Sequence, residues 1–130
     1  LFTKMMLPAL IFLYGTGGVA AGIFVTGGTD MFMFGISEGD LHGVAAWITL
    51  SAIMTLMAVG AFVQPLGGKS PVIRKMSLAL LVLTTTAVLA FVMAPPEPLI
   101  KGLLQRAFFV TTMTWVFVSS MYVAKRLKHS

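Results

Sequence analysis

Four long apolar stretches constrain the fold of this sequence more than any other feature. They cover residues 5–26, 41–63, 76–93 and 103–124, and within them only His42 and Arg106 are titratable side chains other than tyrosine. A membrane-spanning helix needs about 20 mostly apolar residues, and runs this continuous lack the alternating pattern of barrel strands. We therefore predict an all-α polytopic membrane protein in which residues 1–130 form a single transmembrane domain, a four-transmembrane-helix bundle.

The overall composition supports a membrane protein over a water-soluble one. Only 10% of the residues are charged and 58% are hydrophobic, whereas a soluble domain carries roughly 25% charged residues. The sequence contains no cysteine, which excludes a disulfide framework, a thiolate metal site and a cysteine nucleophile.

The charged residues orient the four spans. One side of a four-span arrangement receives seven basic residues, Lys4, Lys69, Arg74, Lys75, Lys125, Arg126 and Lys128. The other side receives Lys101, Arg106 and all four acidic residues, Asp30, Glu38, Asp40 and Glu97. The positive-inside rule then predicts that both termini are cytoplasmic, in a bacterial or archaeal cytoplasmic membrane. The net charge of +5 therefore indicates orientation in a lipid bilayer, and its scattered distribution argues against nucleic-acid binding.

Small and hydroxylated residues within the spans indicate how the helices pack. Gly15, Gly18 and Gly22 form a small-residue stripe in the first span, with a GxxxG pair, a pattern that allows close helix packing in lipid. The partner helix can belong to the same chain, which we favour, or to another one. Threonine clusters in the third and fourth spans can bond to carbonyls of their own helix or bridge to a neighbouring helix; they are Thr84, Thr85 and Thr86, and Thr111, Thr112 and Thr114.

Polar residues near the outer ends of two spans form the candidate site. Asp40 and His42 open the second span, and Gln105 and Arg106 open the fourth. Asp40 stands where an N-cap is expected, and a guanidinium this deep is costly unless it is paired or reaches the interface. One interpretation is a structural clasp in which Arg106 pairs with Asp40 or Glu38. The other is an outer-face site for a lipid, quinone, pigment or other hydrophobic small molecule.

The sequence indicates no catalytic, cofactor or metal site. One histidine with one or two carboxylates is too few ligands for zinc, and no phosphate-binding loop or nucleophile elbow is present. The central parts of the spans lack Asp, Glu, Lys, Arg and His, whereas ion-coupled transporters usually carry such groups at mid-membrane depth. We expect a protein that is not an enzyme.

Three short segments resemble a known membrane-protein family. The pair His42-Gly43, the run from Gly102 to Arg106 (GLLQR) and the glycine-rich stretch from Gly17 to Phe24 are similar to the family called domain of unknown function 998. The resemblance implies about six spans, of which this chain would supply the last four, with the first two lying before Leu1 or absent. It marks His42, Gly43, Gln105 and Arg106 as family positions and implies no established activity. The short proline-containing segment at residues 94–101 departs from the family pattern.

Two functional hypotheses follow. The first is a non-enzymatic accessory or structural subunit that packs against other membrane protein chains in a respiratory, photosynthetic or transport complex. The second is a binding module for a hydrophobic small molecule at Asp40, His42, Gln105 and Arg106.

Overall fold

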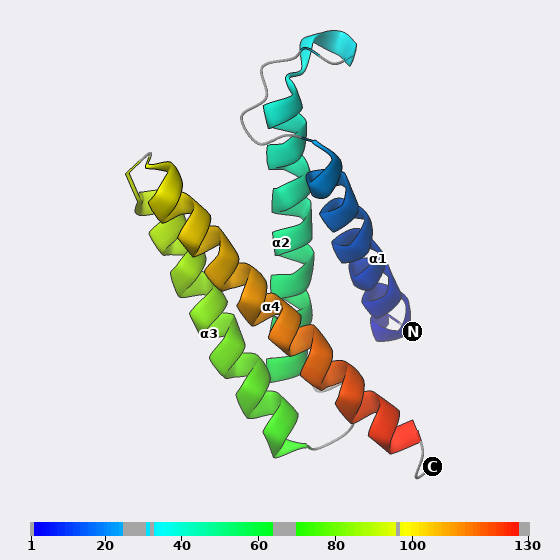
Figure 1. Ribbon diagram of the computed structural model, residues 1–130. Helices are drawn as coiled ribbons and strands as arrows, with labels where there is room; N and C mark the ends of the chain where they lie inside the picture. Colours follow the sequence, from blue (N-terminus) through cyan, green and yellow to red (C-terminus); the bar gives the residue numbers. More distant parts are fainter. Residues whose placement is uncertain (1, 25–30, 32, 64–69, 96, 128–130) are drawn as a thin grey trace. The chain divides into compact units, whose positions relative to one another are not determined.

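The computed structural model describes residues 2–24, 31, 33–63, 70–95 and 97–127. Four helices account for nearly all of them, in the order α1 (Phe2–Ile23), α2 (Glu38–Phe62), α3 (Pro71–Met93) and α4 (Pro98–Leu127), with a short 3-10 turn, η1 (Met33–Gly35), before α2 (Figure 1). No strand occurs among the described residues; an isolated bridge between Met31 and Ser37 closes the turn around η1. The predicted all-α fold is confirmed.

Three of the helices are long and apolar enough to cross a membrane: α1 over Met5–Ile23, α2 over Glu38–Phe62 and α3 over Pro71–Met93. This indicates an integral membrane protein. Within the described part of the chain, α4 does not join them, although a fourth span was predicted there. Its N-terminal third carries Lys101, Gln105 and Arg106, whereas residues 107–124 carry no charged side chain.

The helix ends follow from capping chemistry. Pro71 takes the first position of α3 after Ser70, and the Arg74 amide bonds to the Ser70 carbonyl at 3.3 Å, an arrangement that suits proline because its missing N–H is not needed there. The helix stops at Met93 because Ala94 is extended, the conformation favoured before a proline.

The helix α1 begins earlier than its predicted span. Pro8 therefore lies in the second helical turn, inside the helix. It removes one backbone hydrogen bond there.

The chain divides into two compact units, Leu1–Leu56 and Met57–Ser130, with the boundary inside α2. In the first unit, α1 runs antiparallel to the N-terminal part of α2 (Figure 1). In the second unit, α3 and α4 form an antiparallel hairpin, and the last turns of α2 belong to the same unit.

Two side-chain hydrogen bonds and one aromatic contact join α3 to α4. The indole N–H of Trp115 donates to Ser77 Oγ at 2.8 Å, and both residues are buried. Thr84 Oγ1 and Thr111 Oγ1 lie 2.9 Å apart, and the rings of Phe91 and Phe108 meet edge to face at 6.3 Å. Ser77, Thr84 and Phe91 are seven residues apart and so share one face of α3.

The predicted roles of the threonine hydroxyls are confirmed. One pair, Thr84 and Thr111, bridges two helices. Most of the others bond within their own helix, Thr85 to the Leu81 carbonyl and Thr114 to the Val110 carbonyl, both at 2.8 Å.

The last turns of α2 fit against this hairpin because Gly60 has no side chain. A Cβ on Gly60 would stand 2.8 Å from Ser77 Oγ and 3.4 Å from the Trp115 ring. Met57, one turn earlier, is fully buried, with its sulfur 3.9 Å from Thr84 Oγ1. The core of the second unit therefore consists of apolar and hydroxyl-bearing side chains from three helices.

Candidate functional site

The imidazole of His42, on the second turn of α2, reaches the C-terminal end of α1. Its Nδ1 lies 2.8 Å from the Ala21 carbonyl oxygen and 3.0 Å from that of Phe24. Because carbonyl oxygens only accept, Nδ1 carries the proton in both contacts. The last carbonyls of a helix have no partner within it, so His42 caps α1 and ties it to α2.

Asp40 belongs to a capping box. Ser37 stands at the N-cap of α2; its hydroxyl accepts from the Asp40 amide at 3.1 Å, and Asp40 Oδ2 accepts from the Ser37 amide at 3.3 Å and from its hydroxyl at 2.6 Å. These reciprocal bonds satisfy free N–H groups at the helix start. Asp40 is thus the third helical residue, not the N-cap, because α2 begins one turn earlier than its predicted span.

The other two site residues lie in the second unit. Gln105 and Arg106 are exposed on α4, whereas Asp40 and His42 belong to the first unit. The pairing of Arg106 with Asp40 or Glu38 therefore stays a prediction. Near Arg106 the structure adds a contact that the sequence analysis missed: Lys101 Nζ lies 5.4 Å from the centre of the Phe91 ring, within cation–π range.

Potential metal ligands do not cluster in the part of the chain that the structure describes. Among the described residues, no group of three or more His, Cys, Asp or Glu side chains is arranged to hold a metal ion. The two described members of the candidate site in the first unit instead use their polar atoms to cap helices.

The glycines of α1 differ sharply in their surroundings. Gly17 is buried against α2: a Cβ there would stand 2.5 Å from Thr49 Oγ1 and 3.2 Å from the Ala45 carbonyl oxygen. A Cβ on Gly18 would come no closer than 3.9 Å to Thr49, and a Cβ on Gly15 or Gly22 would meet no atom outside its own helix backbone within 4 Å in the described part of the first unit. The close approach of α1 to α2 therefore uses Gly17, which is not one of the three predicted stripe residues.

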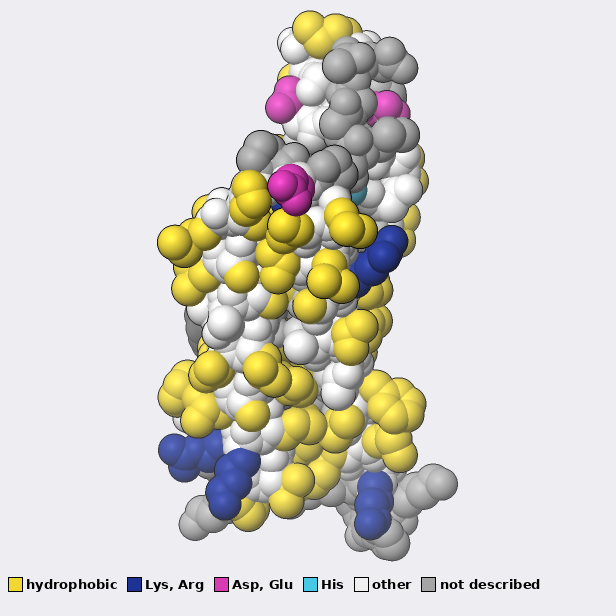
Figure 2. Space-filling model, turned by 60° about the vertical axis from the view of Figure 1, so that its left-hand side comes forward, with side chains coloured by type: hydrophobic (Ala, Val, Ile, Leu, Met, Phe, Trp, Pro, Cys, Tyr) yellow, Lys and Arg dark blue, Asp and Glu magenta, His cyan; other side chains and the backbone are white. Residues whose placement is uncertain are grey.

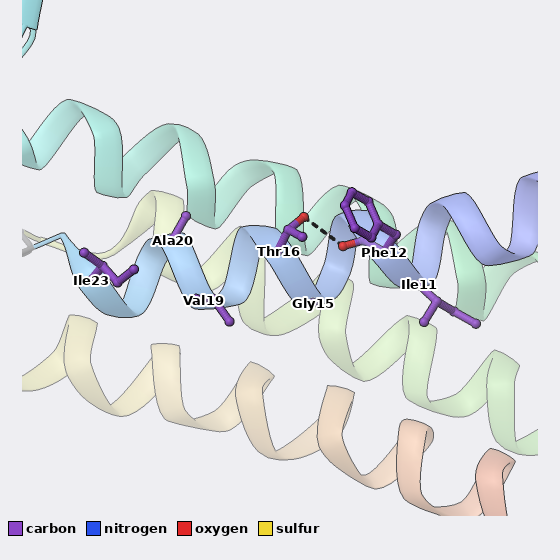
Figure 3. A pocket seen from close by; sticks show the side chains of 7 residues that line it. All are labelled: Ile11, Phe12, Gly15, Thr16, Val19, Ala20 and Ile23. Carbon is purple, nitrogen blue, oxygen red and sulfur yellow. Dashed lines mark hydrogen bonds between the residues drawn. The ribbon is translucent and has the colours of Figure 1, made fainter.

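Gly15 instead forms the floor of a shallow groove on α1. The groove measures about 420 Å³ and is lined by residues of α1 alone. Figure 3 shows them in two rows on either side of Gly15, with Thr16 turned back to bond the Phe12 carbonyl at 2.8 Å; they are Ile11, Phe12, Thr16, Val19, Ala20 and Ile23. Ile11, Phe12, Val19 and Ile23 are all more than half exposed.

Comparison with known proteins gives one match. The family model described as "Protein of unknown function (DUF998)" matches residues 3–122. No curated protein matches this chain significantly. No solved structure does so either.

Proposed function

The chain belongs to the DUF998 family of proteins of unknown function, and we propose that it is a non-enzymatic subunit of a larger membrane complex. In this proposal it spans the membrane four times, with both termini cytoplasmic, and docks another membrane helix on the groove of α1. The observation that carries the proposal is the open space around Gly15 and Gly22 in the first unit.

The pairing of α3 and α4 supports α4 as a fourth span. Three contacts join the two helices from Ser77 to Phe91, a length of about 21 Å at 1.5 Å per residue. A helix bonded to a spanning helix over this length shares its depth in the membrane. From Ala107 to Ala124, α4 contains no charged residue.

The groove on α1 has the features of a helix-docking surface. Lipid tails are as apolar as leucine, so burying apolar surface alone gives little drive for association, and close van der Waals packing decides it. Gly15 lets a neighbouring backbone approach, while Phe12 and Val19 provide ridges beside it. Gly17 already allows the close approach of α2 to α1. The groove at Gly15 is therefore available to a second helix.

The polar groups of the first unit support a structural role over a chemical one. His42 and Asp40 cap α1 and α2, and Thr49, which faces Gly17, bonds to the Ala45 carbonyl of its own helix at 2.8 Å. Each of these groups is engaged in holding the helices.

Two glycine substitutions test the proposal. In Gly15→Leu the new side chain meets nothing in its own unit, so the chain should keep its helicity and thermal stability. It would also fill the groove, so the membrane protein that co-purifies with the wild-type chain in mild detergent should be lost. Gly17→Leu is the matched control, because overpacking against Thr49 should destabilise the chain itself, by about 1–3 kcal/mol.

The measurement is native gel electrophoresis of the tagged chain from its own host, with circular dichroism of each variant. A wild-type chain that migrates alone as a monomer would contradict the proposal. Retention of the partner by Gly15→Leu would show that docking uses another surface.

A further inference from the structure

Basic side chains gather at one end of the α3–α4 hairpin. Arg74 and Lys75 lie within the first five residues of α3, Lys125 lies within the last three of α4, and all three are exposed. Because the helices are antiparallel and Trp115 bonds to Ser77 near this end, the start of α3 and the end of α4 lie at the same end of the hairpin. Figure 2 shows dark blue side chains at this end of the molecule. We call Arg74, Lys75 and Lys125 the basic end.

The second unit does not neutralise this charge. Residues 57–130 contain a single acidic residue, Glu97, which follows α3 at the opposite end of the hairpin. Arg74 and Met93 are 19 positions apart, which corresponds to about 28 Å of helix, well beyond a Debye length of about 8 Å. Three more basic residues flank the basic end in the sequence, Lys69, Arg126 and Lys128.

Helix dipoles do not supply or cancel the charge either. The start of α3 carries partial positive charge and the end of α4 partial negative charge, so the two antiparallel dipoles largely offset each other at this end. The surplus positive charge therefore comes from the side chains, which can move to meet a ligand.

The depth of the basic end relative to the membrane indicates which anion it meets. Since α3 is long and apolar enough to cross a membrane, its first turns lie at a membrane–water boundary. Tyr122, one turn before Lys125 on α4, is a residue type enriched at that boundary. At this level the abundant anions are lipid phosphates, and guanidinium and ammonium groups bind them through charge-assisted hydrogen bonds.

We propose that the basic end binds the headgroups of anionic phospholipids. The inference does not depend on the docking groove of α1. The opposite end of the hairpin provides an internal contrast, because Lys101 lies over the Phe91 ring at 5.4 Å and Glu97 offsets part of the positive charge there.

The test uses the full chain in phosphatidylcholine vesicles that contain spin-labelled lipid. Electron spin resonance gives the association of labelled phosphatidylglycerol relative to labelled phosphatidylcholine. The wild-type chain should prefer phosphatidylglycerol, and Arg74→Gln combined with Lys75→Gln should lower that preference at least about threefold, since each basic residue near the surface contributes measurably to binding anionic lipid. The control, Lys101→Gln, removes a positive charge at the other end of the hairpin and should leave the preference nearly unchanged.

Three results would overturn the proposal: a wild-type chain without preference, a preference that survives the Arg74 and Lys75 changes, or an equal loss in the control. Circular dichroism checks the fold of each variant. If the first variant fails to fold, the wild-type preference measured at 1 M salt decides instead, because screening should abolish it and persistence would refute the proposal.

Discussion

At the start of α2, the imidazole of His42 donates from Nδ1 toward the carbonyls of Ala21, in the last turn of α1, and of Phe24, which follows α1. This contact gives a structural reason for a histidine near the end of an otherwise apolar span. The sequence had left two interpretations of His42 open, a structural clasp and a binding site. Nδ1 therefore acts as the donor that satisfies carbonyls at the end of α1.

Substitution of His42 tests this assignment. His42→Ala should lower the free energy of unfolding in detergent by about 1–2 kcal/mol, because carbonyls at the end of α1 lose their donor. His42→Gln, which keeps an N–H donor of similar reach, should recover part of the loss. Thr86→Val serves as the control, because the exposed Thr86 hydroxyl bonds to the Val82 carbonyl of its own helix. Equal stability of His42→Ala and the wild-type chain would show that the cap is not structural.

At the level of helices, sequence patterns predict where a helix lies better than how it is rotated. The apolar length of residues 41–63 and 76–93 located α2 and α3, but α2 starts after its cap Ser37 and α3 starts at Pro71, which suits the first helical position. The Ser-x-x-Asp pattern from Ser37 to Asp40 was a readable signal for the start of α2.

The rotation of a helix about its axis decides which of its small residues face a neighbouring helix. The sequence predicts this rotation poorly here, because a span that is apolar on all sides has little apolar periodicity. Gly17 faces α2 and Gly15 does not, although both stand in the same glycine-rich run. The partners of His42 are backbone carbonyls of Ala21 and Phe24, which no side-chain pattern marks. The candidate residues were therefore predictable from the sequence, whereas their contacts were not.

The contact between Trp115 of α4 and Ser77 of α3 is the buried polar bond that joins the hairpin near the basic end. A double-mutant cycle with Trp115→Phe and Ser77→Ala should give a coupling energy of about 0.6–1.7 kcal/mol, the range measured for such bonds between membrane helices. The control cycle combines Thr114→Val with Ser77→Ala. Because the Thr114 hydroxyl bonds to its own helix, this cycle should give a coupling energy near zero. Unfolding in detergent provides the free energies, and equal couplings in the two cycles would rule out a specific bond.

For the whole molecule, charge placement predicts orientation and helix pairing predicts the number of crossings. The sequence contains no cysteine, so single cysteines can report both. Cysteines placed at Ser70, before α3, at Glu97, between α3 and α4, and at Ser130, the last residue, distinguish the arrangements. With four spans and cytoplasmic termini, a membrane-impermeant maleimide added to intact cells should label position 97 alone.

Positions 70 and 130 should then be labelled only after the membrane is permeabilised. If α4 failed to cross, positions 97 and 130 would be labelled together, and an inverted chain would expose positions 70 and 130 and protect position 97. The same assay links orientation to the basic end, because Arg74, Lys75 and Lys125 must lie on the side of positions 70 and 130. Labelling of position 97 alone would therefore place the proposed anionic-lipid site in the cytoplasmic leaflet.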